Sequence, residues 1–80
     1  MDTAIRLDSN DKTFYAIRGS TYRMKGDYIK ALRDLNEAIK LDSNYAWAFD
    51  QRARVYRAQG RNDLADADTA TANRLRAAGY

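Results

Sequence analysis

Two arginine–aspartate combinations recur in the chain at the same spacing. Arg18 and Arg52 lie 34 residues apart, and each is followed 16 residues later by an aspartate, Asp34 or Asp68. A guanidinium and a carboxylate can form two parallel hydrogen bonds, which makes such a pairing strong and geometrically specific. The arginines could instead contact a ligand, but both partners of each pair recur together. We therefore predict that Arg18 binds Asp34 and Arg52 binds Asp68 between the helices of each repeated unit.

Several kinds of catalytic and metal chemistry lack the residues they need. The chain contains no histidine and no cysteine. This argues against a zinc site and excludes nucleophilic catalysis by a cysteine or by a serine–histidine pair. The carboxylates are spread at helical spacing, as in solvated faces and ion pairs, and Gly26 and Gly60 are single turn glycines rather than a phosphate-binding loop. We therefore predict a protein that is not an enzyme and that uses no cofactor and no metal ion.

A 34-residue period organises most of the chain. Residues 4–10 read Ala-Ile-Arg-Leu-Asp-Ser-Asn, and residues 38–44 repeat six of these seven residues. The same offset also relates Tyr22 to Tyr56. A period of this length is typical of a supersecondary unit repeated along a solenoid, in which each unit packs on its neighbours.

The recurring residues resemble the tetratricopeptide repeat. The motif in this chain comprises Gly19, Tyr22, Gly26-Asp27-Tyr28, Ala31, Leu35, Ala38 and Leu41-Asp42. The resemblance covers nearly the whole chain, although the family usually has proline where this chain has Ser9 and Ser43. It implies an all-α fold in which antiparallel helix-turn-helix repeats form a right-handed α-solenoid.

We expect a single domain over residues 1–80. Residues 1–10 would form a partial repeat and residues 11–44 the first full repeat. Residues 45–80 would form the second repeat, whose last helix caps the solenoid. Because about three repeats are usually needed for stability, we expect the chain to be a piece of a longer solenoid or to borrow surface from a partner.

Apolar periodicity and turn residues predict four full helices. They are expected over residues 11–25, 28–41, 44 or 45–59, and 62–77. The candidate N-terminal caps are Ser9 or Asn10, Asp27, and Ser43. Gly19 costs about 1 kcal/mol inside a helix, so we expect a close approach of the neighbouring helix there.

The last helix should bury one face and expose another. Its predicted inward residues are Leu64, Ala65, Ala72 and Leu75. In the first repeat, the residues predicted to face the following helix are Leu32, Leu35 and Ile39. Their equivalents one period later are Asp66, Thr69 and Asn73. A polar outer face is what a terminal repeat needs, so we expect these last three side chains to be exposed.

The resemblance implies that the first helix of each repeat lines a concave groove that binds a protein or peptide. The candidate groove residues are Ala16, Ser20, Arg23, Trp47, Asp50, Gln51, Arg54 and Arg57. A tryptophan beside arginines is typical of a binding hot spot. The arginines favour a ligand with acidic residues or a terminal carboxylate. An equally weighted alternative is that Trp47 covers the neighbouring helix and that the arginines are merely solvated.

Self-association is a second hypothesis for the function. Phe14, Ile17, Thr21 and Met24 form another apolar stripe on the first full helix. In a longer solenoid a preceding repeat would cover this stripe, and here only residues 4–7 are available. An uncovered apolar stripe favours association, so we expect a weak homodimer if this hypothesis holds.

Charge and hydropathy bear on the remaining classes of partner. The chain has 14 basic and 11 acidic residues, a net charge of +3, and no run of basic residues. A nucleic-acid-binding helical repeat is therefore the least favoured hypothesis. No apolar run approaches the roughly 18 residues of a membrane span, and no signal peptide opens the sequence. We therefore expect no membrane partner and favour the cytoplasm.

Overall fold

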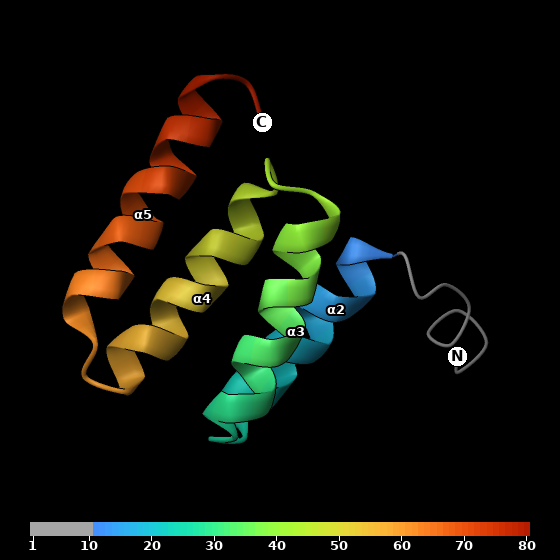
Figure 1. Cartoon of the computed structure of the whole chain (residues 1–80), viewed down its shortest axis with the longest axis vertical. Coiled ribbons are helices and arrows are strands. Elements are labelled where there is room, and N and C mark those ends of the chain that lie inside the picture. Colours follow the sequence, from blue (N-terminus) through green and yellow to red (C-terminus); the bar gives the residue numbers. More distant parts are fainter. Residues whose placement is uncertain (1–10) are drawn as a thin grey trace.

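Four α-helices make up the described part of the chain. The computed structural model describes residues 11–80, so the predicted partial repeat over residues 1–10 lies outside the described residues. The helices are α2 (Lys12–Met24), α3 (Tyr28–Leu41), α4 (Ala46–Ala58) and α5 (Asn62–Ala77) (Figure 1). Their bounds agree with the predicted spans to within two residues.

The helices form two hairpins that lie side by side. Helix α2 packs on α3 and α4 packs on α5, while α3 and, less extensively, α2 join the first hairpin to α4. Successive helices run in alternating directions, and the molecule is flat, with extents of 37 × 31 × 17 Å (Figure 1). This arrangement confirms the predicted all-α fold of antiparallel helical repeats.

The first two helices begin at aspartate caps. Asp11 caps α2, rather than the predicted Ser9 or Asn10, and accepts a hydrogen bond from the backbone N–H of Thr13 at 2.9 Å. Asp27 caps α3 as predicted and accepts from a first-turn N–H at 3.2 Å. A carboxylate at this position satisfies free N–H groups and complements the positive end of the helix dipole.

Helix α4 begins without a side-chain cap. Its N-cap residue is Tyr45, so the predicted cap at Ser43 is wrong. The side chain of Asp42, which ends α3, accepts a hydrogen bond from the backbone N–H of Asn44 at 2.9 Å. This side-chain hydrogen bond of Asp42 stabilises the turn that leads from α3 to α4. Ser43 lies within this turn and therefore does not occupy the N-cap position of α4.

Small residues fill the core where the helices cross. One cluster consists of Ala16, Ala31, Leu35, Ala38, Ala48 and Val55, with Leu32 and Ile39 packed against it. A smaller cluster between α4 and α5 consists of Ala46, Ala72 and Leu75, with Phe49 packed against it. A Cβ added at Gly19 would lie 2.8 Å from Leu35 Cγ, which confirms the predicted close approach of α2 and α3. Small side chains at the crossing points allow the helix axes to lie close together.

The outer face of α5 is mainly polar, as predicted. Asp66 and Asn73 are exposed, whereas Thr69 is partly buried. Ala65, Ala72 and Leu75 are buried as predicted, but the prediction that Leu64 points inward is wrong. Leu64 is exposed because it lies in the first turn of α5, at the position that the exposed Lys30 occupies one period earlier.

Candidate functional site

Both predicted arginine–aspartate pairs are present. Arg18 donates to Asp34 through Nε at 2.7 Å and through Nη2 at 2.8 Å. Arg52 donates to Asp68 through Nε and Nη2, both at 2.8 Å. The aspartates are buried, and the hydrogen bond to its aspartate raises the pKa of each arginine. These arginines join the two helices of each hairpin, so their role is structural.

Arg52 also ties the two hairpins together. Its Nη1 donates to Asn36 Oδ1 of α3 at 2.9 Å. Its guanidinium carbon lies 5.4 Å from the ring centroid of Phe49, a distance at which a cation is attracted to an aromatic face. Arg52 therefore links α3, α4 and α5 and helps to fix α4 against the first hairpin.

The predicted groove residues of α4 follow one side of the helix. This groove stripe has the helical spacing i, i+3, i+7, i+10 and consists of Trp47, Asp50, Arg54 and Arg57. Two of its charges are already paired with α5. Asp50 accepts from Arg76, and Arg57 lies 3.2 Å from Asp66. The groove stripe is therefore less charged than its sequence indicates.

Arg23 and Arg54 are the groove cations without a carboxylate partner among residues 11–80. Arg54 is exposed, and Arg23 and Ser20 of α2 are partly exposed. Arg23 lies on α2 and Arg54 on α4, and these two helices are in contact. Two such guanidinium groups can each donate to a carboxylate of a ligand.

Two predicted groove residues are buried, which corrects their assignment. Ala16 is fully buried, and Gln51 is 7% exposed. Gln51 shares a face of α4 with Ala48 and Val55, which belong to the same core cluster as Ala16. That face packs on the first hairpin, so neither Ala16 nor Gln51 offers surface to a ligand in the groove.

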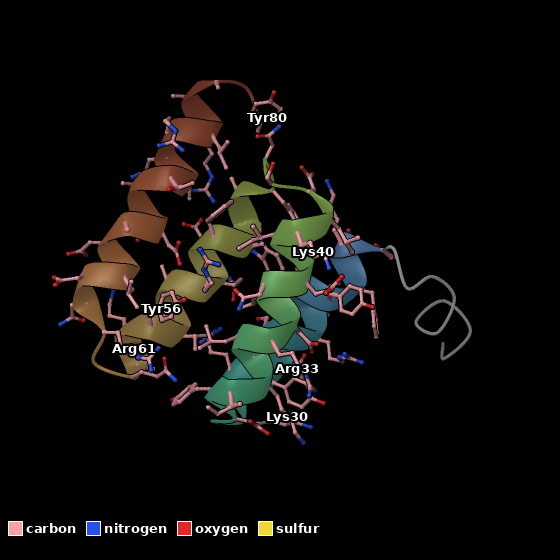
Figure 2. All side chains as sticks on the ribbon, in the orientation of Figure 1. Lys30, Arg33, Lys40, Tyr56, Arg61 and Tyr80 are labelled. Atoms are coloured by element: carbon pink, nitrogen blue, oxygen red, sulfur yellow. The ribbon has the colours of Figure 1, made fainter. Side chains whose placement is uncertain are left out.

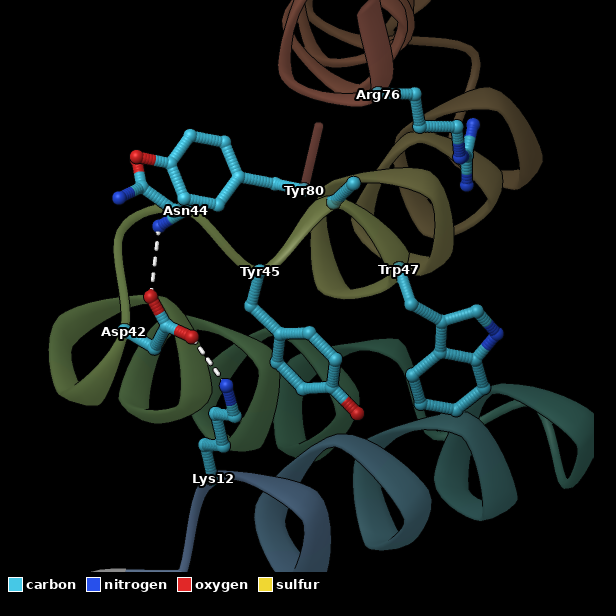
Figure 3. Close-up of a pocket in the computed structure, with 8 residues that line it drawn as sticks. Lys12, Asp42, Asn44, Tyr45, Trp47, Arg76 and Tyr80 are labelled. Atoms are coloured by element: carbon cyan, nitrogen blue, oxygen red, sulfur yellow. Dashed lines mark hydrogen bonds and ion pairs between the residues drawn. The ribbon is translucent and has the colours of Figure 1, made fainter. Parts of the chain in front are cut away.

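A pocket lies beside the groove stripe at the start of α4. Its volume is about 310 Å³, and it is lined by Lys12, Asp42, Asn44, Tyr45, Ala46, Trp47, Arg76 and Tyr80. Figure 3 shows Tyr45 and Trp47 reaching from the start of α4 toward α2, and Tyr80 arriving from beyond the end of α5. Lys12 donates a hydrogen bond to Asp42, which lowers the pKa of this carboxyl group.

Sequence reasoning identified Trp47 but missed the other residues of this pocket. Tyr45 has a usable signal, because an aromatic residue two positions before Trp47 lies just ahead of the same helix. No sequence signal identifies Arg76 and Tyr80. They come from the C-terminal end of the second hairpin, and the 34-residue period does not relate them to Trp47. Their proximity depends on how α5 folds back along α4.

The predicted self-association stripe is partly exposed. Ile17 is 55% exposed and Met24 is 69% exposed, whereas Phe14 and Thr21 are partly buried. The residues of α4 that lie 34 positions after Phe14, Ile17 and Thr21 are all buried. They are Ala48, Gln51 and Val55. The first hairpin covers this face on α4, and no described residue covers it equally on α2. The predicted cover by residues 4–7 lies outside the described residues.

Some of the charged side chains among residues 11–80 form ion pairs with side chains of opposite charge. Besides the buried pairs, Lys30 lies 3.8 Å from Asp27 on the surface. Across residues 11–80, no group of three or more potential ligand side chains is placed to hold a metal ion. None of the described helices combines the length and the apolar character needed to cross a membrane.

A family model described as TPR repeat matches residues 19–60, just over half of the chain. The matched span runs from the middle of α2 to the turn after α4, and so includes the contact between the two hairpins. No curated protein matches the chain.

Proposed function

Because the chain belongs to the tetratricopeptide repeat family, we propose that it is a non-catalytic module that binds a peptide, or an extended segment of a partner protein, along α2 and α4. Repeats of this family generally mediate protein–protein interaction. The proposed site comprises the groove stripe of α4 together with Ser20 and Arg23 of α2. It supplies surface and charge to a ligand and performs no chemistry on it.

The pattern of paired and unpaired charges carries this proposal. Arg76 neutralises Asp50, so this carboxylate repels an acidic ligand less than a free one would. Arg23 and Arg54 have no carboxylate partner among residues 11–80. A ligand with acidic residues or a terminal carboxylate would satisfy both groups through charge-assisted hydrogen bonds. Two hairpins form a short groove, so the dissociation constant should be about micromolar at best.

We expect Arg54→Glu to weaken the binding of acidic peptides about tenfold or more. The change replaces a hydrogen bond to a charged group, worth about 1.5–3 kcal/mol, with repulsion, and about 1.4 kcal/mol corresponds to a factor of ten. Peptides would be recovered from a randomised display library and resynthesised for titration. The fluorescence of Trp47, the only tryptophan, would report binding within the groove stripe.

Arg33→Glu is the matched control for this experiment. Arg33 is an exposed arginine on α3, outside the groove stripe (Figure 2). Both variants change the net charge equally, so a non-specific electrostatic attraction would weaken equally in both. Equal losses, or undiminished binding by Arg54→Glu, would contradict binding in the groove.

Homodimerisation is a second candidate function, favoured by the exposure of Ile17 and Met24. The equivalent face of α4 is buried, which shows that this side of the repeated unit is suited to packing. The outer face of α5 is mainly polar and offers no matching apolar surface for a head-to-tail contact. A dimer would therefore pair α2 with α2 about a two-fold axis.

Ile17→Glu combined with Met24→Glu should abolish such a dimer, because each protomer would bring two carboxylates into an apolar contact. Sedimentation equilibrium over a wide concentration range measures the association. Ile29→Glu is the control, because Ile29 is an exposed isoleucine on α3. A protein that is monomeric at every concentration, or a dimer that survives the double substitution, would rule this candidate out.

A further inference from the structure

The pocket at the start of α4 is large enough to receive one side chain of a ligand. Its volume of about 310 Å³ lies at the lower end of the range for ligand pockets, roughly 300–1,000 Å³. Three parts of the chain build it: the start of α2, the α3–α4 turn with the first turn of α4, and the last turn of α5 with the end of the chain that follows it (Figure 3). Trp47 belongs to both the pocket and the groove stripe, so the two surfaces are continuous.

Aromatic rings form much of the pocket wall. The ring centroids of Tyr45 and Trp47 lie 6.2 Å apart, and the ring planes are tilted by 39°. Tyr80 is a third ring, and it is largely exposed. Aromatic rings favour offset or edge-on neighbours with centroids about 4.5–7 Å apart, and such contacts add to the gain from burying apolar area. A further ring in this pocket would make contacts of this kind.

The charges around the pocket favour an uncharged ligand group. Lys12 pairs with Asp42, and Arg76 pairs with Asp50. An acidic group would have to compete with these aspartates for the two cations. A basic group would meet Lys12, whose Nζ already lies 4.7 Å from the ring centroid of Tyr45. A neutral planar ring disturbs neither ion pair.

We infer that the pocket receives an uncharged aromatic side chain of the peptide bound in the groove, an inference that rests on the proposed function. Trp47 and Arg54 are seven residues apart on α4, which corresponds to about 10 Å along a helix that rises 1.5 Å per residue. An extended peptide covers about 3.3 Å per residue, so this separation matches about three residues. The fitting ligand carries an aromatic residue three positions from an acidic one.

Capped tetrapeptides test this spacing with the full chain. The probes are Phe-Ala-Ala-Glu and its reverse, Glu-Ala-Ala-Phe, which cover both chain directions. Their counterparts carry leucine or lysine in place of phenylalanine. Two-dimensional amide NMR titrations yield weak dissociation constants and show which residues respond. We expect one phenylalanine probe to bind about fivefold more tightly than its leucine counterpart and to shift the amide signals of Ala46, Trp47 and Tyr80.

Tyr80→Ala should remove this preference for phenylalanine, because it deletes one ring of the wall. Ile29→Ala is the matched control, because it removes another largely exposed apolar side chain outside the pocket, and it should preserve the preference. The pocket assignment is overturned if the leucine or lysine probes bind as tightly as phenylalanine, or if Tyr80→Ala has no effect. Continued sensitivity of those probes to Arg54→Glu would then leave the groove proposal intact.

Capped phenylalanine amide alone separates a peptide side chain from a free aromatic molecule. If it binds as tightly as the tetrapeptides and is unaffected by Arg54→Glu, the pocket is a site for a small aromatic molecule and the inference is overturned. Weaker binding of the single residue, with the tetrapeptide affinity dependent on both Tyr80 and Arg54, supports the inference.

Discussion

Arg18→Ala is expected to lower the free energy of unfolding by about 3 kcal/mol. The change leaves Asp34, which is 2% exposed, without the two hydrogen bonds that the guanidinium donates. A buried carboxylate without a partner must either stay ionised in a poorly hydrated place or take up a proton, and both cost free energy. The side chain of Arg18 is 40% exposed, so water can reach part of the vacated space. Removing one partner of a buried ion pair costs about 3–5 kcal/mol, and we expect the loss of stability in Arg18→Ala to lie near the lower end of this range.

Removing both charges should cost less than removing the arginine alone. The double change Arg18→Leu with Asp34→Leu leaves no buried carboxylate to hydrate, and apolar replacements of buried ion pairs are often nearly neutral. Urea denaturation followed by far-ultraviolet circular dichroism gives the free energies of unfolding. Arg57→Ala is the control, because it breaks an exposed ion pair with Asp66 and should change stability by less than about 1 kcal/mol.

Two outcomes would count against a stabilising role for the buried pair. One is an Arg18→Ala variant as stable as Arg57→Ala. The other is a double variant that loses as much free energy as Arg18→Ala alone. Either would mean that Asp34 finds water or another donor once the guanidinium is gone, so that its burial carries little free-energy cost.

The internal period is what made the fold and the ion pairs predictable from the sequence. Two copies of one pattern must satisfy the same contacts, so a residue pair that recurs as a pair is constrained by packing within each copy. The helix ends were predictable for a local reason. Gly26 and Gly60 have φ angles of 83° and 79°, a region that other residues rarely adopt. Each follows the last turn of a helix, where a left-handed residue ends it.

The division between groove and core could not be predicted in the same way. Gln51 is polar and follows Asp50 directly, so the sequence alone suggests an exposed position. One residue corresponds to about 100° around a helix, which is enough to turn Gln51 from the groove into the contact with the first hairpin. The neighbour that covers each side depends on how the hairpins stack. The pocket beside Trp47 depends equally on the path of α5, because Arg76 and Tyr80 complete its wall.

Gly19→Val is expected to lower the free energy of unfolding by about 3 kcal/mol. Even a bare Cβ at this position would lie 2.8 Å from Leu35 Cγ and 3.2 Å from the backbone oxygen of Ala31. Leu35 is fully buried and the backbone oxygen cannot rotate away, so the contact between α2 and α3 must open. Overfilling a packed core costs about 1–3 kcal/mol, and the two methyl groups of valine place this change at the upper end. Gly19→Ala should destabilise the protein less, because the higher helix propensity of alanine offsets about 1 kcal/mol of the steric cost.

The second hairpin provides an internal control for this steric argument. One period later, Ala53 stands in place of Gly19 and the smaller Thr69 in place of Leu35. Ala53→Gly should therefore relieve no clash and should only lose about 1 kcal/mol of helix propensity. In the first hairpin, Gly19→Ala combined with Leu35→Thr should cost less than the sum of the two single losses, because the clash requires both larger groups. Strictly additive losses in urea denaturation would show that contact with Leu35 is not what restricts Gly19 to glycine.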